Sequence, residues 1–231
     1  MKATKSLLGI TTTGLFLLLA TQIGAISNAN NLTNTTNKNG IQSSSAIRVA
    51  TATVNKPAPN FVATDTNGKN HRLTDFKGKV VVLEWTNHDC PFVRKHYGSS
   101  NMQKLQKELT GKGAVWISII SSAPGMQGYV SASQANELTK SRNASPTAVI
   151  LDPEGKIGKQ YGARTTPHIF VIDKNSNIGY MGAIDSIPSP DPADIPKADN
   201  YVRDAVNALI SGKSVTNSQT QPYGCSVKYG G

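Results

Sequence analysis

Runs of apolar residues, separated by polar segments, divide the middle of the chain into short strands and longer helices. Four runs are nearly continuous and of strand length, as expected of strands that are covered on both faces. These runs are Val80–Trp85, Ala114–Ile120, Ala148–Leu151 and Ile169–Ile172. A further strand over Asn177–Met181 is expected to pair with the last of them as a hairpin.

Helical spacing marks three further segments. The first begins at Pro91, because proline suits the first position of a helix, and Gly98 weakens its middle. The second is Ser131–Arg142. The third is indicated by one apolar stripe, made of Tyr201, Val202, Ala205 and Leu209. Strands that alternate with helices predict an α/β fold with a central mixed β-sheet flanked by helices.

The start of the chain has the pattern of a cleaved secretory signal. Lys2 and Lys5 precede the apolar run Leu7–Ala20, and the small residues Ser27 and Ala29 follow it. The run is shorter than the roughly 20 residues that a membrane span needs. We therefore expect an exported protein, periplasmic or extracellular, with no stable membrane insertion after cleavage.

Composition sets the expected domain boundaries. Residues 1–29 are assigned to the signal peptide, and residues 30–56 to a flexible leader rich in Asn, Thr and Ser, which has too few apolar residues to form a core. The packed domain is expected over 57–212, followed by a polar C-terminal tail over 213–231. The formal net charge is +10, but the basic residues are spread out, so a nucleic-acid partner is not expected.

Two cysteines, Cys90 and Cys225, are the candidates for chemistry. Cys90 lies between a buried strand and Pro91, at the start of a predicted helix. The unpaired N–H groups and the dipole at a helix N-terminus favour an anion, so this position lowers the pKa of a thiol and makes its sulfur a better nucleophile. Cys225 lies in the polar tail, where no comparable field is expected.

Four segments resemble the AhpC/TSA-type redoxins and the exported thioredoxin-like oxidoreductases. The segments are Pro57–Phe61, Leu73–Leu83, Trp85–Arg94 and Gly162–Asp173. The resemblance implies a thioredoxin-like fold over 57–212, with Cys90 at the position of the first cysteine of a Cys-x-x-Cys active site. The second cysteine of that motif is replaced by Val93.

This replacement leaves the role of Cys225 open. A valine cannot resolve a mixed disulfide, so either the protein works with one cysteine or another thiol resolves it. The polar, glycine-containing surroundings of Cys225 suit a mobile arm that could bring this thiol to Cys90. A permanent structural Cys90–Cys225 bridge is the alternative, since closing so long a loop would stabilise the fold by about 5 kcal/mol.

The resemblance also implies roles for other residues. Glu84 takes the place of a carboxylate that serves in proton transfer to the active-site sulfur, although it can equally be a carboxylate satisfied by neighbouring donors. Pro167 is expected to follow a cis peptide bond and to leave the backbone of Thr166 available to a bound peptide. The candidates for substrate contact are Trp85, Pro91, Thr166 and Pro167.

The leading functional prediction is an exported thiol–disulfide oxidoreductase that uses Cys90 on a protein or small-molecule disulfide or thiol, with an external thiol reductant as a further partner. One alternative is a thiol peroxidase, but Leu83 and Asn87 stand where the peroxiredoxin motif has Pro and Thr. Another is a binding module with a structural disulfide. No cofactor is expected, and no metal either, although His88 and His168 with Cys90 would supply three ligands if their loops met.

Overall fold

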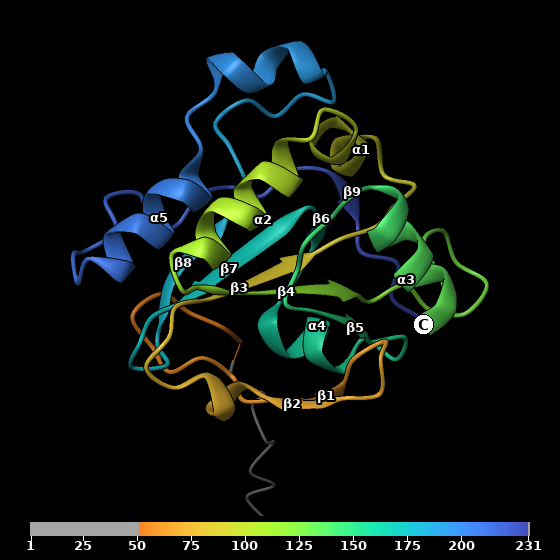
Figure 1. Ribbon diagram of the computed structural model, residues 1–231, viewed down its shortest axis with the longest axis horizontal. Helices are drawn as coiled ribbons and strands as arrows, with labels where there is room; N and C mark the ends of the chain where they lie inside the picture. Colours follow the sequence, from red (N-terminus) through yellow and green to blue (C-terminus); the bar gives the residue numbers. More distant parts are fainter. Residues whose placement is uncertain (1–50, 231) are drawn as a thin grey trace, which may run out of the picture. The chain divides into compact units, whose positions relative to one another are not determined.

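The computed structural model describes residues 51–230 (Figure 1). Its main sheet has five strands in the order β5-β4-β3-β7-β8. Strands β5 (Ala148–Leu151), β4 (Val115–Ile120) and β3 (Val81–Trp85) run parallel, while β7 (His168–Ile172) and β8 (Ile178–Gly182) are antiparallel to their neighbours. The predicted strands and the mixed α/β sheet are therefore confirmed.

Helices cover both faces of this sheet. Helices α1 (Pro91–Gly98), α2 (Asn101–Gly111) and α5 (Tyr201–Ile210) pack on one face, and α4 (Lys156–Tyr161) packs on the other. Helix α3 (Ala132–Ser141) precedes β5. The remaining elements are the hairpin strands β1 (Val62–Thr64) and β2 (Asn70–Arg72), the short helices η1 (Leu73–Phe76) and η2 (Pro192–Lys197), and the pair β6 (Thr165–Thr166) and β9 (Cys225–Ser226).

Strand alternation divides the buried side chains into two large clusters. Val82 of β3 and Val80, which directly precedes the strand, face the cluster under α1, α2 and α5, whereas Leu83 and Trp85 face the cluster under α4. Successive side chains of a strand point to opposite faces, so Glu84 lies on the same face as Val82. This register places Glu84 and helix α1 on one side of the sheet.

The helix expected to begin at Pro91 is two helices. It ends at Gly98, and α2 starts after Ser100, which has a left-handed backbone with a φ of 60°. Gly98 and the two serines after it, Ser99 and Ser100, therefore separate two helices instead of lying in the middle of one. Helix α4 and strand β9 are absent from the sequence-based prediction, because both are too short to show a period.

Packing begins earlier than the boundary expected at residue 57. Ala52 is buried against the α4-side cluster, and the N–H of Asn55 donates to the carbonyl of Ile178 at 2.8 Å. The last residues of the predicted flexible leader are therefore part of the domain. The rest of that leader and the predicted signal peptide lie outside the described residues.

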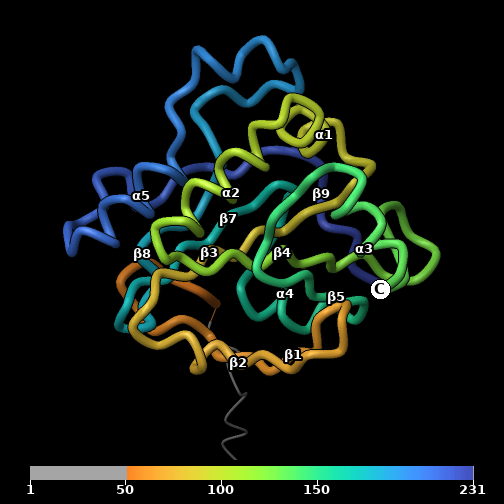
Figure 2. Tube along the Cα trace, viewed as in Figure 1, coloured from red at the N-terminus to blue at the C-terminus, as the bar shows by residue number. Residues whose placement is uncertain are grey.

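The expected mobile tail is also docked in the structure. The N–H of Met181 donates to Ser218, and the N–H of Thr220 donates to Met181, so the tail follows β8 before it reaches β9. Figure 2 traces this return of the chain towards the sheet. Within residues 51–230, no helix is both long enough and apolar enough to cross a membrane.

Candidate active site

Cys90 is the N-cap residue of α1. Strand β3 ends at Trp85, and the following loop turns so that the N–H of Cys90 donates to Asn87 at 3.1 Å. Pro91 occupies the first helical position, where its missing N–H costs no hydrogen bond. The predicted helix start at Cys90 is confirmed. The Cys90 side chain is 0% exposed, so its sulfur is covered in this arrangement.

The tail brings the second cysteine to the first. Strand β9 pairs antiparallel with β6, with Cys225 opposite Thr166. The Cys90 thiol donates to the Thr166 carbonyl at 3.0 Å, and the peptide bond between Thr166 and Pro167 is cis, as predicted. Both cysteines are free thiols here, and Thr166 connects them, since its carbonyl contacts Cys90 and it lies opposite Cys225 in the β6–β9 pair. The structure thus joins predicted site residues from three distant parts of the sequence, namely Cys90, Thr166 with Pro167, and Cys225.

The two thiols differ in acidity. Burial alone would raise the pKa of Cys90, but the surrounding polar groups of Cys225, Val93 and Thr166 lower it overall. Burial, together with the hydrogen bond and the charge of Cys90, raises the pKa of Cys225 to about 11. Cys90 is therefore the more acidic thiol of the pair, and Cys225 is the less acidic one.

Glu84 is fully buried on the face of the sheet that α1 and α2 cover, and both of its carboxylate oxygens accept hydrogen bonds. Its carboxylate accepts from Trp116 Nε1 at 2.8 Å, from the Ser118 hydroxyl at 2.9 Å and from the Tyr97 hydroxyl at 2.9 Å. Burial raises the pKa of Glu84, although these donors oppose the effect. Its bonded partners are these donors and Gln106, and Cys90 is not among them. These contacts support the interpretation of Glu84 as a carboxylate that neighbouring donors satisfy. Its role in proton transfer stays a prediction.

Trp85 does not lie where a substrate contact would require. It is 0% exposed and points to the α4 side, where its ring lies 5.4 Å from Tyr161 and 5.2 Å from Phe170. Its Nε1 donates to Ser121 at 3.1 Å. Alternation along β3 turns Trp85 away from the face that carries Cys90, and the expected substrate contact of Trp85 stays a prediction. Pro91, in contrast, is exposed beside Cys90.

The histidines proposed as possible ligands are used elsewhere. His168 Nδ1 accepts from the backbone N–H of Arg164 at 3.2 Å, and its ring packs 4.5 Å from Phe170. His88 is half-buried next to Asp89, with Nε2 3.4 Å from that carboxylate. Across residues 51–230, no three or more His, Cys, Asp or Glu side chains gather as they would around a metal ion.

One part of the site carried no signal in the sequence. Lys95 of α1 is buried and lies 3.3 Å from the carboxylate of Asp185. The hydroxyl of Tyr223, two residues before Cys225, donates to the same carboxylate. A lysine on a short amphipathic helix is usually expected to face solvent, and Asp185 lies in a loop, so only the folded chain reveals this buried cluster.

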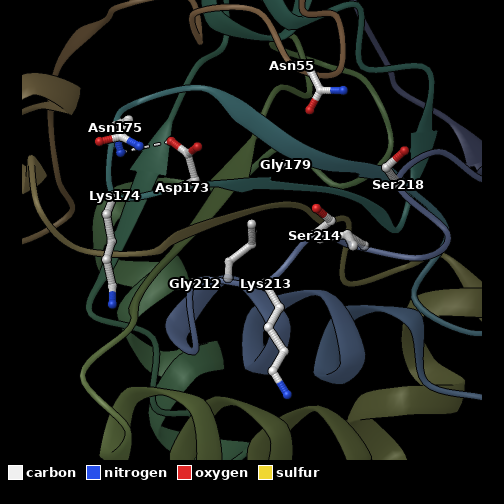
Figure 3. A pocket seen from close by; sticks show the side chains of 11 residues that line it. Asn55, Asp173, Lys174, Asn175, Gly179, Gly212, Lys213, Ser214 and Ser218 are labelled. Atoms are coloured by element: carbon white, nitrogen blue, oxygen red, sulfur yellow. Dashed lines mark hydrogen bonds between the residues drawn. The ribbon is translucent and has the colours of Figure 1, made fainter.

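A cavity of about 350 Å³ lies between the turn that joins β7 and β8 and the C-terminal end of α5 (Figure 3). Its lining includes Asp173, whose carboxylate accepts from the N–H of Asn175 at 2.9 Å and of Asn177 at 2.8 Å. Lys174 Nζ donates to the carbonyl of Ile210 at 2.7 Å. These polar groups serve the turn itself, and neither cysteine lines the cavity.

Curated relatives of this chain are thiol-disulfide oxidoreductases. ResA of Bacillus thuringiensis subsp. konkukian is 31% identical over 125 residues, which cover 54% of this chain and 66% of that protein. ResA of Geobacillus thermodenitrificans is 24% identical over 132 residues, with the same coverage. The chain thus spans just under two thirds of the length of these relatives.

Solved structures resemble the described fold more completely. An uncharacterized conserved protein from Geobacillus kaustophilus has a TM-score of 0.65 at 24% identity and covers 77% of this chain and 93% of its own. A hypothetical protein from Sinorhizobium meliloti 1021 has a TM-score of 0.64 at 23% identity, with 78% and 97% covered. Residues 54–181 match the AhpC/TSA family, more than half of the sequence. This chain therefore belongs to the AhpC/TSA family and has its thioredoxin-like fold.

Proposed function

We propose that this protein is an exported thiol–disulfide oxidoreductase in which Cys90 is the nucleophile and Cys225 is the resolving cysteine. The observation that carries the proposal is the pairing of β9 with β6, which sets Cys225 opposite Thr166, the residue whose carbonyl contacts the Cys90 sulfur at 3.0 Å. The lowered pKa of Cys90 and the raised pKa of Cys225 support the same assignment. The names of the ResA relatives support the same reaction class.

The reaction begins at Cys90. Its thiolate attacks one sulfur of a substrate disulfide R–S–S–R′, so that a Cys90–S–S–R bond forms, the original disulfide breaks and R′ leaves as a thiolate. Proton uptake converts R′ to its thiol. The helix N-terminus stabilises the attacking anion but not the mixed disulfide, which is neutral.

Cys225 completes the exchange. Burial and the neighbouring Cys90 raise the pKa of Cys225. The contribution of Cys90 ends once its sulfur is in a mixed disulfide, because that sulfur then carries no negative charge. Cys225 then loses its proton more easily and attacks the sulfur of Cys90, which forms the Cys90–Cys225 disulfide and releases R as a thiolate. Two electrons have passed from the dithiol to the substrate, and an external thiol restores the reduced protein.

The Cys225→Ser variant tests this assignment. It should hold a mixed disulfide between Cys90 and the substrate, visible on a non-reducing gel and by intact mass, because no internal thiol remains to release it. Thermal unfolding of the same variant distinguishes a resolving role of Cys225 from a purely structural one. If the role is purely structural, the substitution lowers the thermal stability and traps no substrate. Cys90→Ser is the matched control and should neither trap nor turn over a disulfide.

Export is part of the proposal and has its own test. The basic start, the apolar run and the small residues at Ser27 and Ala29 support cleavage after this segment. N-terminal sequencing of the protein from its native host should find a mature start near Asn28 to Asn30. Retention of Met1 on a cytosolic protein would contradict export.

A further inference from the structure

The tail occupies the strand edge beside Cys90. Cys225 lies opposite Thr166 in the β6–β9 pair, and the N–H of Val227 donates to the carbonyl of Arg164 at 3.0 Å. Figures 1 and 2 show β9 crossing next to β6, close to α1. The tail therefore binds as an added antiparallel strand, which is the way an extended peptide binds to a free sheet edge.

Tyrosines anchor the tail on both sides of Cys225. Upstream, the hydroxyl of Tyr223 donates to buried Asp185, and its ring lies 5.8 Å from Phe92 of α1. Downstream, the hydroxyl of Tyr229 donates to the carbonyl of Ala163 at 2.8 Å. A side chain at Gly158 would overlap Tyr229, so α4 is shaped to receive that ring.

With the tail in place, neither thiol is ready to react with an outside molecule. Cys90 has the more acidic sulfur but is 0% exposed. Cys225 is partly exposed, but it is the protonated member of the pair. Since the thiolate is the attacking species, a substrate has to reach Cys90, and the tail has to leave first.

The docked tail also shows what this edge can hold. Gly224 has a φ of 131°, and a Cβ there would overlap the carbonyl of Thr166, so only glycine fits directly before the cysteine. Ser226 is exposed, so the edge does not restrict which side chain can follow the cysteine. Val227 packs against the apolar cluster under α4. The edge therefore fits an extended segment of the pattern Gly-Cys-any-apolar.

The family resemblance already implies that the backbone at Thr166 receives a bound peptide. We propose that residues 223–229 are a resident occupant of this edge, and that a protein segment of the pattern Gly-Cys-any-apolar displaces them beside Cys90 as the substrate. This proposal rests on the proposed function and narrows it to protein disulfides. The tail then acts twice, first as the segment that a substrate displaces and afterwards as the carrier of the resolving thiol.

The first experiment loosens the tail without touching either cysteine. Tyr229→Ala removes the downstream anchor, while Ser226→Ala is the matched control, because Ser226 is exposed and its hydroxyl accepts a hydrogen bond from Lys228 Nζ at 3.2 Å. Alkylation of Cys90 by iodoacetamide, followed by mass spectrometry, should become about tenfold faster in Tyr229→Ala and should stay unchanged in Ser226→Ala. Equal rates in both variants and the wild type would overturn the displacement step.

The second experiment tests the sequence pattern. The probe is the peptide Tyr-Gly-Cys-Ser-Val-Lys-Tyr with its cysteine in a disulfide with thionitrobenzoate, and its partner peptide has alanine in place of glycine. The full chain should release the coloured thiolate about tenfold faster from the glycine peptide. Equal rates from both peptides would overturn the pattern while leaving the oxidoreductase proposal standing.

A binding measurement keeps the inference independent of the chemistry. The glycine peptide with serine in place of cysteine should speed hydrogen exchange at the Val227 amide, because it takes the place of the tail on β6. The matching alanine peptide should not. If no disulfide is reduced at all, the proposed function fails, and this exchange measurement still decides whether the edge binds such a segment.

Discussion

Glu84 shows how one buried residue can have two separable roles. Its carboxylate is the common acceptor for donors on α1, α2 and β4, namely Tyr97, Gln106, Trp116 and Ser118. Removing the acceptor leaves those donors unpaired inside the core, whereas an amide of the same size still accepts through one oxygen. The two substitutions therefore separate structure from proton transfer.

We expect Glu84→Ala to lower the free energy of unfolding by at least about 3 kcal/mol, because it leaves buried donors unpaired and opens a cavity. Glu84→Gln should retain most of that stability, as measured by urea denaturation. If proton transfer also depends on Glu84, the Gln variant will change the pH–rate profile of disulfide exchange. An unchanged profile would return Glu84 to a purely structural role, and a stable Ala variant would contradict the packing argument.

At the scale of elements, the first turn of α4 contacts buried Asp152 on one side and Tyr229 of the tail on the other. Asp152 is buried after β5, and its carboxylate accepts from the N–H of Ile157 at 3.2 Å and of Gly158 at 2.9 Å. It also accepts from the Ser121 hydroxyl at 2.6 Å. This carboxylate accepts hydrogen bonds from helix N–H groups that would otherwise lack partners. Its negative charge at the N-terminus also interacts favourably with the helix dipole.

Asp152→Ala is expected to lower the free energy of unfolding by about 2 kcal/mol, because the first turn of α4 loses its acceptor. Asp199→Ala is the control, since Asp199 is exposed, and a change within about 0.5 kcal/mol is expected there. Chemical denaturation of both variants gives the comparison. Equal losses would show that the Asp152 carboxylate does not support α4.

At the scale of the whole molecule, buried neutral histidines make stability depend on pH. Burial lowers the pKa of His96 to about 4, with Lys95 acting in the same direction and Asp185 opposing it. The unfolded chain, with an ordinary histidine pKa near 6.5, binds a proton over the interval in which the folded protein does not. Folding is therefore less favourable as the pH falls from about 6.5 to about 4, and the effect is absent above that range.

The wild type should lose on the order of 3 kcal/mol of unfolding free energy across this interval through His96. His168, with its pKa lowered by burial to about 3, adds to the same trend. His96→Gln should flatten the dependence, as measured by denaturation at several pH values. A wild-type stability that is constant between pH 6.5 and 4 would contradict the assignment of neutral, buried imidazoles.

Local sequence patterns were enough to predict the main strands of the sheet and the start of α1. Continuous apolar runs gave the strands β3, β4, β5 and β7, because strand burial appears directly in the residues of the strand. The placement of Cys90 at a helix start was likewise predictable, because Pro91 marks the first turn. The cis bond before Pro167 followed from a family resemblance rather than from the residues alone.

Only the folded chain decided what surrounds Cys90. The predicted tail was a mobile arm, but Tyr223 and Tyr229 dock it, and their acceptors, Asp185 and Ala163, lie far from them in the sequence. Likewise, the alternation that turns Trp85 away from the site depends on which face of the sheet receives α1. Local patterns determine which segments form strands and helices, whereas pairings between distant segments depend on how those elements pack, and a single sequence does not display those contacts.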